Sequence, residues 1–235
     1  MPASTPPFPL LTRTLDPPAQ QGQRAALVRQ LRARGIGHER VLAAVGAVPR
    51  HLFFDPALAS QAYQDKAFPI GAGQTISQPY TVAYQTALLA PAAGARILEI
   101  GTGSGYQACV LLALGVELHS VELEATLSQQ AARRLAQLGA RAQLYVGDGA
   151  AGLPAHAPFA GILVTAGAVR VPPELLRQLA IGGRLVVPVG PVGGVQKMLR
   201  IERESATDFR REVFADFRFV PLRGPAAEQF GPATA

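Results

Sequence analysis

A short apolar strand that runs into alternating glycines is the most constraining feature of this chain. Residues 96–105 read Arg-Ile-Leu-Glu-Ile-Gly-Thr-Gly-Ser-Gly. Gly101, Gly103 and Gly105 lack a Cβ, so the backbone can turn tightly there and approach a ligand closely. A helix is expected to follow, with its unpaired N–H groups facing the same ligand. The feature therefore predicts a cofactor loop at the end of a strand in an α/β sheet.

One residue limits which cofactor this loop can hold. The dinucleotide-binding fingerprint requires glycine or alanine three positions after its second glycine, so that helix and strand pack closely. Tyr106 occupies that position. The resulting G-x-G-x-G spacing is similar to the S-adenosylmethionine loop of class I methyltransferases. Glycine-rich turns between strands and helices also occur without cofactors, so the loop alone leaves a purely structural role open.

Composition narrows the class of protein. The 235 residues are 49% hydrophobic and 16% charged, which fits one sizeable α/β domain with a large core. Cys109 is the single cysteine, which excludes an intramolecular disulfide and a cysteine-rich zinc site, and the histidines show no metal-ligand spacing. We therefore expect no metal. The net charge of +6 comes from arginines spread along the chain, so we expect solvated helix faces and no nucleic-acid partner.

The chain is expected to divide into four parts. Residues 1–20 are proline-rich and resemble neither a signal peptide nor a membrane span, so we expect a flexible extension. Residues 21–90 are expected to hold N-terminal helices and an active-site loop, and residues 91–225 the cofactor-binding core. Residues 226–235 are expected to form a flexible tail. No stretch reaches the length of a membrane span, and we expect a cytoplasmic monomer without membrane contact.

Hydrophobic patterns predict helices first and an alternating α/β unit afterwards. Helices are expected over 21–34, 38–47, 56–62 and 81–89, with an ordered loop over 68–80. Strands are then expected over 96–100, 117–122, 143–146, 161–165 and 184–189, separated by helices over 106–114, 125–138 and 173–179. Two final strands, 197–203 and 212–220, are expected to pair antiparallel at one edge. This order predicts a doubly wound, mainly parallel seven-stranded sheet, which is the Rossmann-like class I S-adenosylmethionine-dependent methyltransferase fold with an N-terminal helical subdomain.

Polar residues follow the predicted strands at the edge where ligands bind in such sheets. Glu122 ends the second strand, where a carboxylate can accept hydrogen bonds from the ribose hydroxyls of an adenosine cofactor. It can equally cap the next helix. Asp148 lies in a Gly-Asp-Gly turn and can accept from an adenine amino group, although such a turn also occurs without any ligand. With Thr165 after the fourth strand, these residues are expected to converge on one cleft.

The region before the glycine loop resembles the protein-L-isoaspartate O-methyltransferase family. The resemblance covers residues 22–223. The string Gln74-Thr-Ile-Ser-Gln-Pro79 is its most specific piece. The other matching strings are residues 48–53, 61–65, 69–80, 98–107, 147–149, 162–166, 182–190 and 218–222.

The resemblance implies repair of damaged proteins. The family transfers the methyl group of S-adenosyl-L-methionine to the free α-carboxylate of L-isoaspartyl residues in proteins and peptides, leaving S-adenosyl-L-homocysteine. The ester then cyclises to a succinimide, part of which reopens to aspartate. Ser77 matches the family's active-site serine. The residues implied to bind the cofactor are Gln74, Thr75, Ile76, Glu99, Gly101, Thr102, Gly103, Ser104, Gly105, Glu122, Leu123, Asp148, Gly149 and Thr165.

For this reaction, the protein mainly has to align the carboxylate oxygen with the methyl group and the sulfur of the cofactor. A carboxylate with a pKa near ~3.5–4 is ionised at neutral pH, so no general base is required. Holding the reacting groups in line contributes roughly 7–11 kcal/mol. Ser77 is therefore expected to orient one carboxylate oxygen and not to act as a nucleophile. Substrate peptides are expected to lie extended over residues 69–80 and 166–170, near Val220–Leu222. Arg170 differs from the relatives' pattern and receives no role.

Two other functions stay open at this point. One is a methyltransferase of the same fold that acts on a small molecule or a ribosomally made peptide. The other is a cofactor-binding scaffold or nucleic-acid-binding protein that has lost catalysis. The segment Val164-Thr-Ala-Gly-Ala168 lacks the Asn/Asp-Pro-Pro-Tyr motif of many amino and amide N-methyltransferases, and no carboxylate cluster for catechol chemistry follows it.

Overall fold

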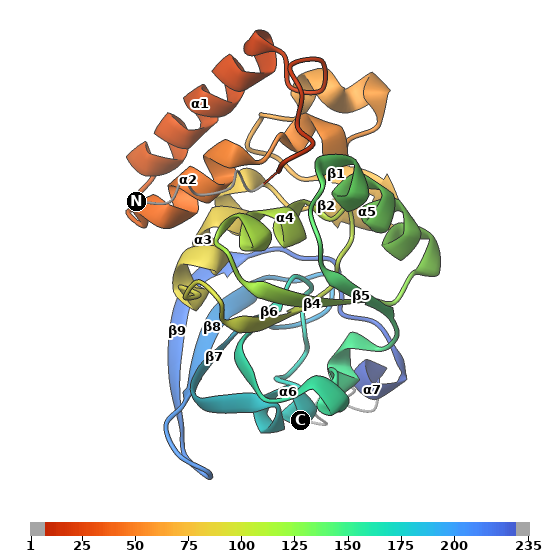
Figure 1. The fold of residues 1–235 in the computed structure, drawn as a ribbon. Coiled ribbons are helices and arrows are strands. Elements are labelled where there is room, and N and C mark those ends of the chain that lie inside the picture. The colour runs from red at the N-terminus through yellow and green to blue at the C-terminus, as the bar shows by residue number, and fades with distance from the viewer. Residues whose placement is uncertain (1–7, 229–235) are drawn as a thin grey trace.

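A computed structural model describes residues 8–228, and a mainly parallel sheet forms its centre (Figure 1). The seven strands have the order β5-β4-β3-β6-β7-β8-β9. Strands β3 to β7 run parallel, whereas β8 is antiparallel to both of its neighbours. Their bounds are β3 Arg96–Ile100, β4 Glu117–Glu122, β5 Gln143–Val146, β6 Phe159–Val164, β7 Leu179–Val189, β8 Gln196–Arg203 and β9 Phe209–Phe217. The predicted methyltransferase-type sheet and its antiparallel edge are confirmed.

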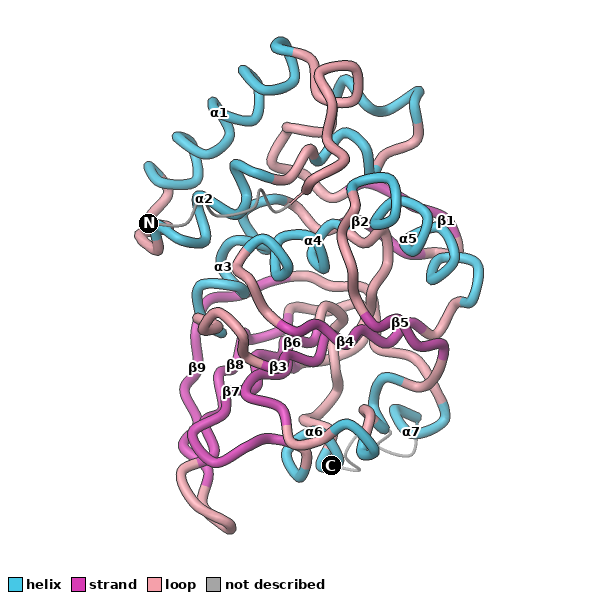
Figure 2. Tube along the Cα trace, in the orientation of Figure 1, coloured by secondary structure: helices cyan, strands magenta, loops and turns pink. Residues whose placement is uncertain are grey.

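Helices cover both faces of this sheet (Figure 2). The helix bounds are α1 Pro18–Ala33, α2 Glu39–Ala47, α3 Pro79–Leu89, α4 Tyr106–Ala113, α5 Ala125–Leu138, α6 Pro173–Arg177 and α7 Pro225–Glu228. Helices α3, α4 and α5 lie on one face, with α1 and α2 stacked outside them, and α6 and α7 lie on the other (Figure 1). Each face has its own cluster of buried apolar side chains. None of the helices within residues 8–228 has the length and apolar character needed to cross a membrane.

Helix α5 illustrates how the sequence pattern produces this packing. Leu127, Ala131, Leu135 and Leu138 recur at three- and four-residue spacing and are all buried. Such spacing places them on one stripe of the helix, which packs toward the sheet. Gly139 follows in the left-handed conformation, which ends the helix at the expected place.

The start of the chain differs from the expected flexible extension. Residues 1–7 lie outside the described part, but α1 begins at Pro18, and Phe8 is only 4% exposed. Asp16 is also buried and forms a bidentate ion pair with Arg24, with both N–O distances below 3 Å. The prolines suggested disorder, yet an aromatic anchor and a buried ion pair fix residues 8–17 to the subdomain. Residues 226–228 likewise belong to α7, whereas 229–235 lie outside the described residues.

The segment over residues 68–80 was expected to be a loop and is a β-hairpin followed by the start of a helix. Strands β1 (Phe68–Gly71) and β2 (Gln74–Ile76) pair antiparallel, and α3 begins at Pro79. The residues that interrupt the hydrophobic pattern form the turn of the hairpin, where Ala72 and Gly73 both have positive φ. Four short 3₁₀ helices complete the fold: η1 Arg50–Phe53, η2 Pro56–Gln61, η3 Gly149–Ala151 and η4 Pro154–His156.

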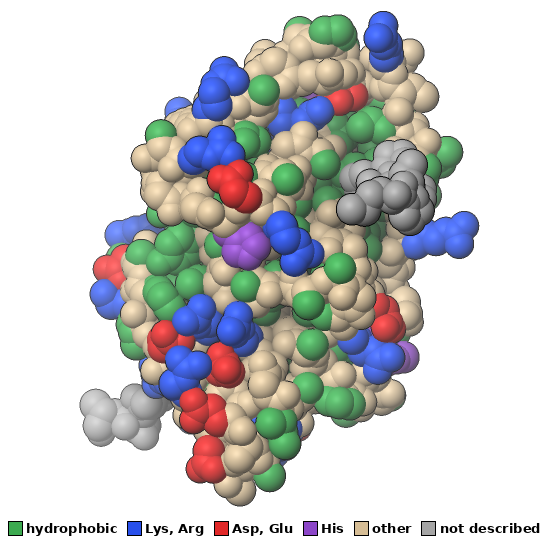
Figure 3. Space-filling model, turned by 60° about the vertical axis from the view of Figure 1, so that its left-hand side comes forward, with side chains coloured by type: hydrophobic (Ala, Val, Ile, Leu, Met, Phe, Trp, Pro, Cys, Tyr) green, Lys and Arg blue, Asp and Glu red, His purple; other side chains and the backbone are tan. Residues whose placement is uncertain are grey.

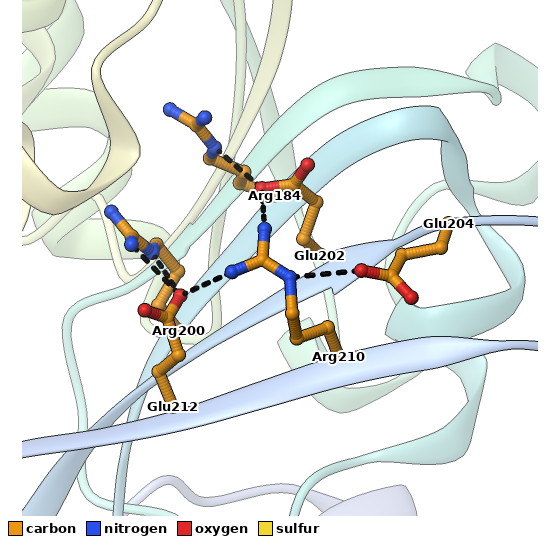
Figure 4. Close-up of polar contacts among 6 residues, drawn as sticks. All are labelled: Arg184, Arg200, Glu202, Glu204, Arg210 and Glu212. Carbon is orange, nitrogen blue, oxygen red and sulfur yellow. Dashed lines mark hydrogen bonds and ion pairs between the residues drawn. The ribbon is translucent and has the colours of Figure 1, made fainter.

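Alternating charges cross the antiparallel edge of the sheet. Arg210 on β9 contacts Glu202, Glu204 and Glu212, and these carboxylates in turn contact Arg184 and Arg200 (Figure 4). Acidic and basic side chains therefore lie side by side on this face (Figure 3). Exposed pairs of this kind add little stability, up to about 1 kcal/mol each. Charged side chains along an edge strand also discourage pairing with another chain.

Candidate active site

The carboxyl ends of β3, β4 and β6 are joined just where the glycine loop begins. The Gly101 N–H donates to the carbonyl of Val121 at 2.8 Å, and the Thr165 hydroxyl lies within hydrogen-bond distance of the carbonyls of Ile100 and Gly101. Gly101 has a φ of +94°, and a Cβ there would lie 2.5 Å from the Thr165 hydroxyl oxygen. Glycine is therefore required at this position by both backbone conformation and space.

Gly105, the third glycine of the loop, allows two helices to pack closely. Gly105 precedes α4 with a φ of +88°, and a Cβ there would lie 2.9 Å from the Leu135 side chain on α5. The absence of a side chain lets α4 and α5 approach each other. Tyr106 then begins α4, fully buried, with its ring against Phe53 of η1 at a centroid distance of 5.6 Å. Tyr106 thus fixes the N-terminal subdomain to the core. It is also the residue by which this loop differs from the dinucleotide-binding fingerprint.

Glu122 holds the glycine loop against the end of β4. Its carboxylate accepts from the Gly103 N–H at 2.7 Å and from the Glu124 N–H, at the start of α5, at 3.0 Å. The carboxylate thus holds the N-cap residue of α5, and Glu122 also lines a cleft. Binding of ribose by Glu122 stays a prediction.

A cleft at this edge encloses about 540 Å³, counting the space that is open to solvent. The predicted site residues that line it are Gln74, Thr75, Gly101, Gly103, Glu122, Leu123, Gly149 and Thr165. Part of its remaining wall comes from residues 220–223 near the C-terminus, a segment that is expected to lie near the peptide. The additional lining residues are Ile100, Val121, Ala166, Val220, Pro221, Leu222 and Arg223.

Two smaller pockets continue from this cleft past Ser77. The second pocket, of about 350 Å³, joins Ser77 to the glycine loop. The third, of about 310 Å³, joins Ser77 to the segment after β9. Thr75 and Thr165 line the cleft and both pockets, so the three spaces adjoin one another. The second pocket is lined by Thr75, Ile76, Ser77, Val82, Gly101, Thr102, Gly103, Ser104, Tyr106, Gln107 and Thr165.

Glu99, expected among the cofactor ligands, is buried beneath the loop and lines none of these three spaces. Its side chain is fully buried and accepts from the Ser120 hydroxyl at 2.5 Å. Ser120 in turn lies 2.6 Å from the Thr102 hydroxyl, so Glu99 supports the loop through two side chains. Burial raises the pKa of Glu99 to about 8, so the carboxyl is mostly neutral at pH 7. A residue in a buried strand could not be assigned its face from sequence alone.

Asp148 is also engaged within the protein. Its carboxylate accepts from the Ala150 N–H at 2.9 Å and from the Ala226 N–H at 2.6 Å. It thereby anchors α7 beside the cleft, while the neighbouring Gly149 lines the cleft wall. Each carboxylate oxygen has a second lone pair, and the contact with adenine stays a prediction.

The residues around the cleft fit S-adenosylmethionine better than they fit a metal. Backbone turns without side chains, a buried carboxylate at a strand end and apolar walls suit an adenosine group. Gln107, in the second pocket, has a buried side-chain carbonyl oxygen without a hydrogen-bond partner in the described structure, which suits a ligand ammonium group. Among residues 8–228, no group of three or more His, Cys, Asp or Glu is arranged to hold a metal ion.

Comparison with known proteins agrees with this geometry. The family model of protein-L-isoaspartate(D-aspartate) O-methyltransferase matches residues 22–227. A protein-L-isoaspartate O-methyltransferase of Cytophaga hutchinsonii is 52% identical over 204 residues, which cover 87% of this chain and 92% of that protein. One of Salinibacter ruber is 52% identical over 210 residues, covering 85% and 91% of the two chains.

Solved structures give the same result for the fold. A protein-L-isoaspartate O-methyltransferase superimposes with a TM-score of 0.78 at 27% identity, covering 87% of this chain and 67% of that one. A Plasmodium falciparum protein, described as a putative protein-L-isoaspartate O-methyltransferase in complex with S-adenosyl-L-homocysteine, gives a TM-score of 0.74 at 21% identity and covers 85% and 98%. The chain belongs to the protein-L-isoaspartate(D-aspartate) O-methyltransferase family.

Proposed function

We propose that this protein methylates the free α-carboxylate of L-isoaspartyl residues in damaged proteins and peptides, with S-adenosyl-L-methionine as the methyl donor. The observation that carries the proposal is the position of Ser77. It lines both the pocket that reaches the glycine loop and the pocket that opens toward the segment after β9. A hydroxyl at the junction of a cofactor space and a second space is suited to holding an acceptor group next to a donor.

The glycine loop, Glu122, Leu123 and Thr165 would hold the cofactor at the carboxyl ends of β3, β4 and β6. When bound, S-adenosylmethionine supplies a methyl group on a sulfonium, and its transfer leaves S-adenosylhomocysteine. The loop needs no large rearrangement to receive such a group, because Glu122 and Thr165 already hold its backbone. Binding energy is then available for alignment and not for ordering the loop.

Ser77 donates its hydroxyl hydrogen to one oxygen of the substrate carboxylate, and the other oxygen is left to accept the methyl group. Its backbone carbonyl accepts from Arg50 at 2.8 Å, which fixes the backbone that carries the hydroxyl. The carboxylate is already ionised at neutral pH, so this side chain has only to orient it. The methyl ester formed then cyclises by attack of the following backbone nitrogen, with methanol leaving, and the succinimide reopens in water.

The third pocket is the proposed entrance for the peptide. Arg218, Phe219 and Val220 line it opposite Ser77 and Gln78. Arg218 is exposed and forms no ion pair with any residue in the part of the chain described. A cation at the rim suits a peptide with a further carboxylate near the isoaspartyl residue. Backbone groups of the extended segment suit a substrate whose neighbouring side chains vary.

The arrangement of the arginines supports a peptide partner over a nucleic acid. Arg184, Arg200 and Arg210 are neutralised by glutamates on the β7–β9 edge and do not form a basic stripe. Nucleic-acid affinity depends on such unpaired cations, which release counterions from phosphates. We expect a monomer that shows no salt-sensitive RNA binding, which filter binding and light scattering would check.

Product analysis tests the proposed function. A synthetic isoaspartyl peptide is incubated with the protein and S-adenosylmethionine, and its products are separated by chromatography. We expect the methyl ester first, then the succinimide, then the aspartyl peptide, with Ser77→Ala blocking the first step. A peptide that stays unmodified, while a small molecule from a metabolite mixture is methylated, would instead favour the second enzyme class.

A further inference from the structure

Arg50 is the largest fully buried side chain in the described structure, with 0% exposure. It begins η1, and its guanidinium donates to two backbone carbonyls from different segments. Nε donates to Ala62 at 2.8 Å and Nη2 donates to Ser77 at 2.8 Å. Arginine is rarely buried to this extent without a strong reason. Burial lowers the pKa of Arg50 to about 10, so the side chain still carries its charge at neutral pH.

The same guanidinium also reaches the cofactor side of the site. It lies over the ring of Tyr106, 4.5 Å from the ring centroid. Tyr106 is the residue directly after the glycine loop and lines the second pocket with Ser77. One planar cation thus contacts both the backbone of Ser77 and the first residue of α4.

A second contact fixes the other end of the Ser77 segment. The Asp65 carboxylate accepts from the Tyr80 N–H at 2.8 Å and also pairs with Arg34, the residue that follows α1. The Arg34 guanidinium lies 4.0 Å from the centroid of the Tyr80 ring. The segment from Ser77 to Tyr80 is therefore held at both ends by charged side chains from the N-terminal subdomain.

We propose that Arg50 is a positioning residue, which fixes Ser77 relative to the glycine loop by donating to the Ser77 carbonyl while stacking on Tyr106. This inference rests on the proposed function of Ser77. The planar fork of arginine can donate to both carbonyls and stack at the same time, whereas the single ammonium of lysine cannot. The N-terminal subdomain would then act in catalysis through this one side chain.

Arg50→Lys tests the inference, with Arg24→Lys as a matched control. Arg24 is a buried arginine of the same subdomain, donating to Asp16, to the Gly46 carbonyl and to Tyr63, but not to the Ser77 segment. We expect both variants to lower the melting temperature. Only Arg50→Lys is expected to lower kcat, by about 10- to 100-fold, because a misplacement of about 1 Å has this effect. Its KM for the peptide should change less than about threefold, a difference no larger than that between independent sites.

A double-mutant cycle with Ser77→Ala separates positioning from general damage. If Arg50 acts through Ser77, Arg50→Lys should cost almost nothing further in the Ser77→Ala background. Multiplying losses would overturn the proposal. So would failure of Arg50→Lys and Arg50→Gln to fold while Arg24→Lys folds, because that result would assign Arg50 a purely structural role.

Amide hydrogen exchange gives a readout that does not depend on activity. We expect faster exchange over residues 74–80 in Arg50→Lys than in Arg24→Lys, with equal exchange in the parallel strands. Equal exchange over residues 74–80 in the two variants would overturn the positioning role. If the wild-type protein fails to methylate the isoaspartyl peptide while this difference appears, the proposed function fails and the positioning role stands.

Discussion

The glycine loop and the Ser77 segment line the same pocket but are held in place by different kinds of contact. The loop is fixed by groups from adjacent strands, chiefly Glu122 at the end of β4 and Thr165 after β6. The Ser77 segment lies outside the large sheet and is fixed by Arg50 and Asp65, which precede it in the chain. The difference suggests that cofactor affinity and acceptor alignment depend on separate sets of residues and can be changed independently.

Ser77→Ala should give the largest effect on methyl transfer and the clearest separation of the two sides. We expect kcat to fall roughly 100-fold, because a misplacement of a reacting group by about 1 Å has an effect of this size. The dissociation constant of S-adenosylmethionine should change little, because the glycine loop is untouched. Steady-state kinetics and calorimetry measure the two quantities. Ser205→Ala, in the exposed β8–β9 turn, is the control; loss of cofactor binding in Ser77→Ala would instead assign Ser77 to the cofactor side.

Glu122→Ala should produce the opposite pattern. The carboxylate contributes a hydrogen bond to Gly103 and a predicted contact with ribose, so we expect cofactor affinity to fall about 10- to 100-fold. At saturating cofactor, kcat should stay within a few-fold of the wild-type value. Glu117→Ala, at the far end of the same strand, is the matched control. An unchanged dissociation constant in Glu122→Ala would refute the assignment.

Glu99→Gln is expected to alter stability more than catalysis. Burial raises the pKa of Glu99 from 4.5 to about 8. Between these values the folded protein keeps a proton that the unfolded chain releases, so the free energy of unfolding falls as pH rises from 4.5 to 8 and then levels off. Replacing the carboxyl should remove this pH dependence. For one full proton, the unfolding constant changes about tenfold per pH unit. Urea unfolding of both proteins from about pH 5 to about pH 8.5, most of the interval between the two pKa values, tests this prediction. Parallel curves of unfolding free energy against pH would contradict a buried neutral carboxyl.

Arg218→Gln should have the smallest effect and should act on the acceptor side alone. We expect KM to rise about two- to fivefold for an isoaspartyl peptide with a neighbouring glutamate, the range of an exposed ion pair. A peptide with glutamine in that position should show no change. Competition between the two peptides at low salt is the most sensitive form of the measurement. Equal changes for both peptides would remove Arg218 from substrate selection.

The structure around the glycine loop could largely be predicted from the sequence, whereas the contacts that hold the Ser77 segment could not. The strand before Gly101, the alternation of strands and helices after it and the mainly parallel sheet follow from local patterns, because hydrophobic runs and glycine turns report nearby structure. The contacts of Arg50 and Asp65 with the Ser77 segment join residues from separate elements, and no periodicity reports them. The hairpin over residues 68–76 was hidden for a related reason, since its short strands are half-exposed and interrupted by the turn.

Residues near the C-terminus show most clearly which contacts cannot be predicted from the sequence. Leu222 and Arg223 complete the wall of the cleft far along the chain from the glycine loop. Their place depends on hydrogen bonds between the backbones of Gly167 and its neighbours Val220 and Leu222, each 2.8 Å long. A sequence motif can indicate that such a segment matters, as Arg218-Phe-Val-Pro-Leu222 did, but its partner follows only from the fold.

The central claim is that Ser77 presents an isoaspartyl carboxylate to a methyl donor held by the glycine loop. Transfer of label from methyl-labelled S-adenosylmethionine to an isoaspartyl peptide, measured beside its aspartyl twin of the same sequence, tests this claim most directly. We predict that the isoaspartyl peptide is labelled and that its twin is not. Equal labelling of the two peptides, or labelling of neither, would contradict the account.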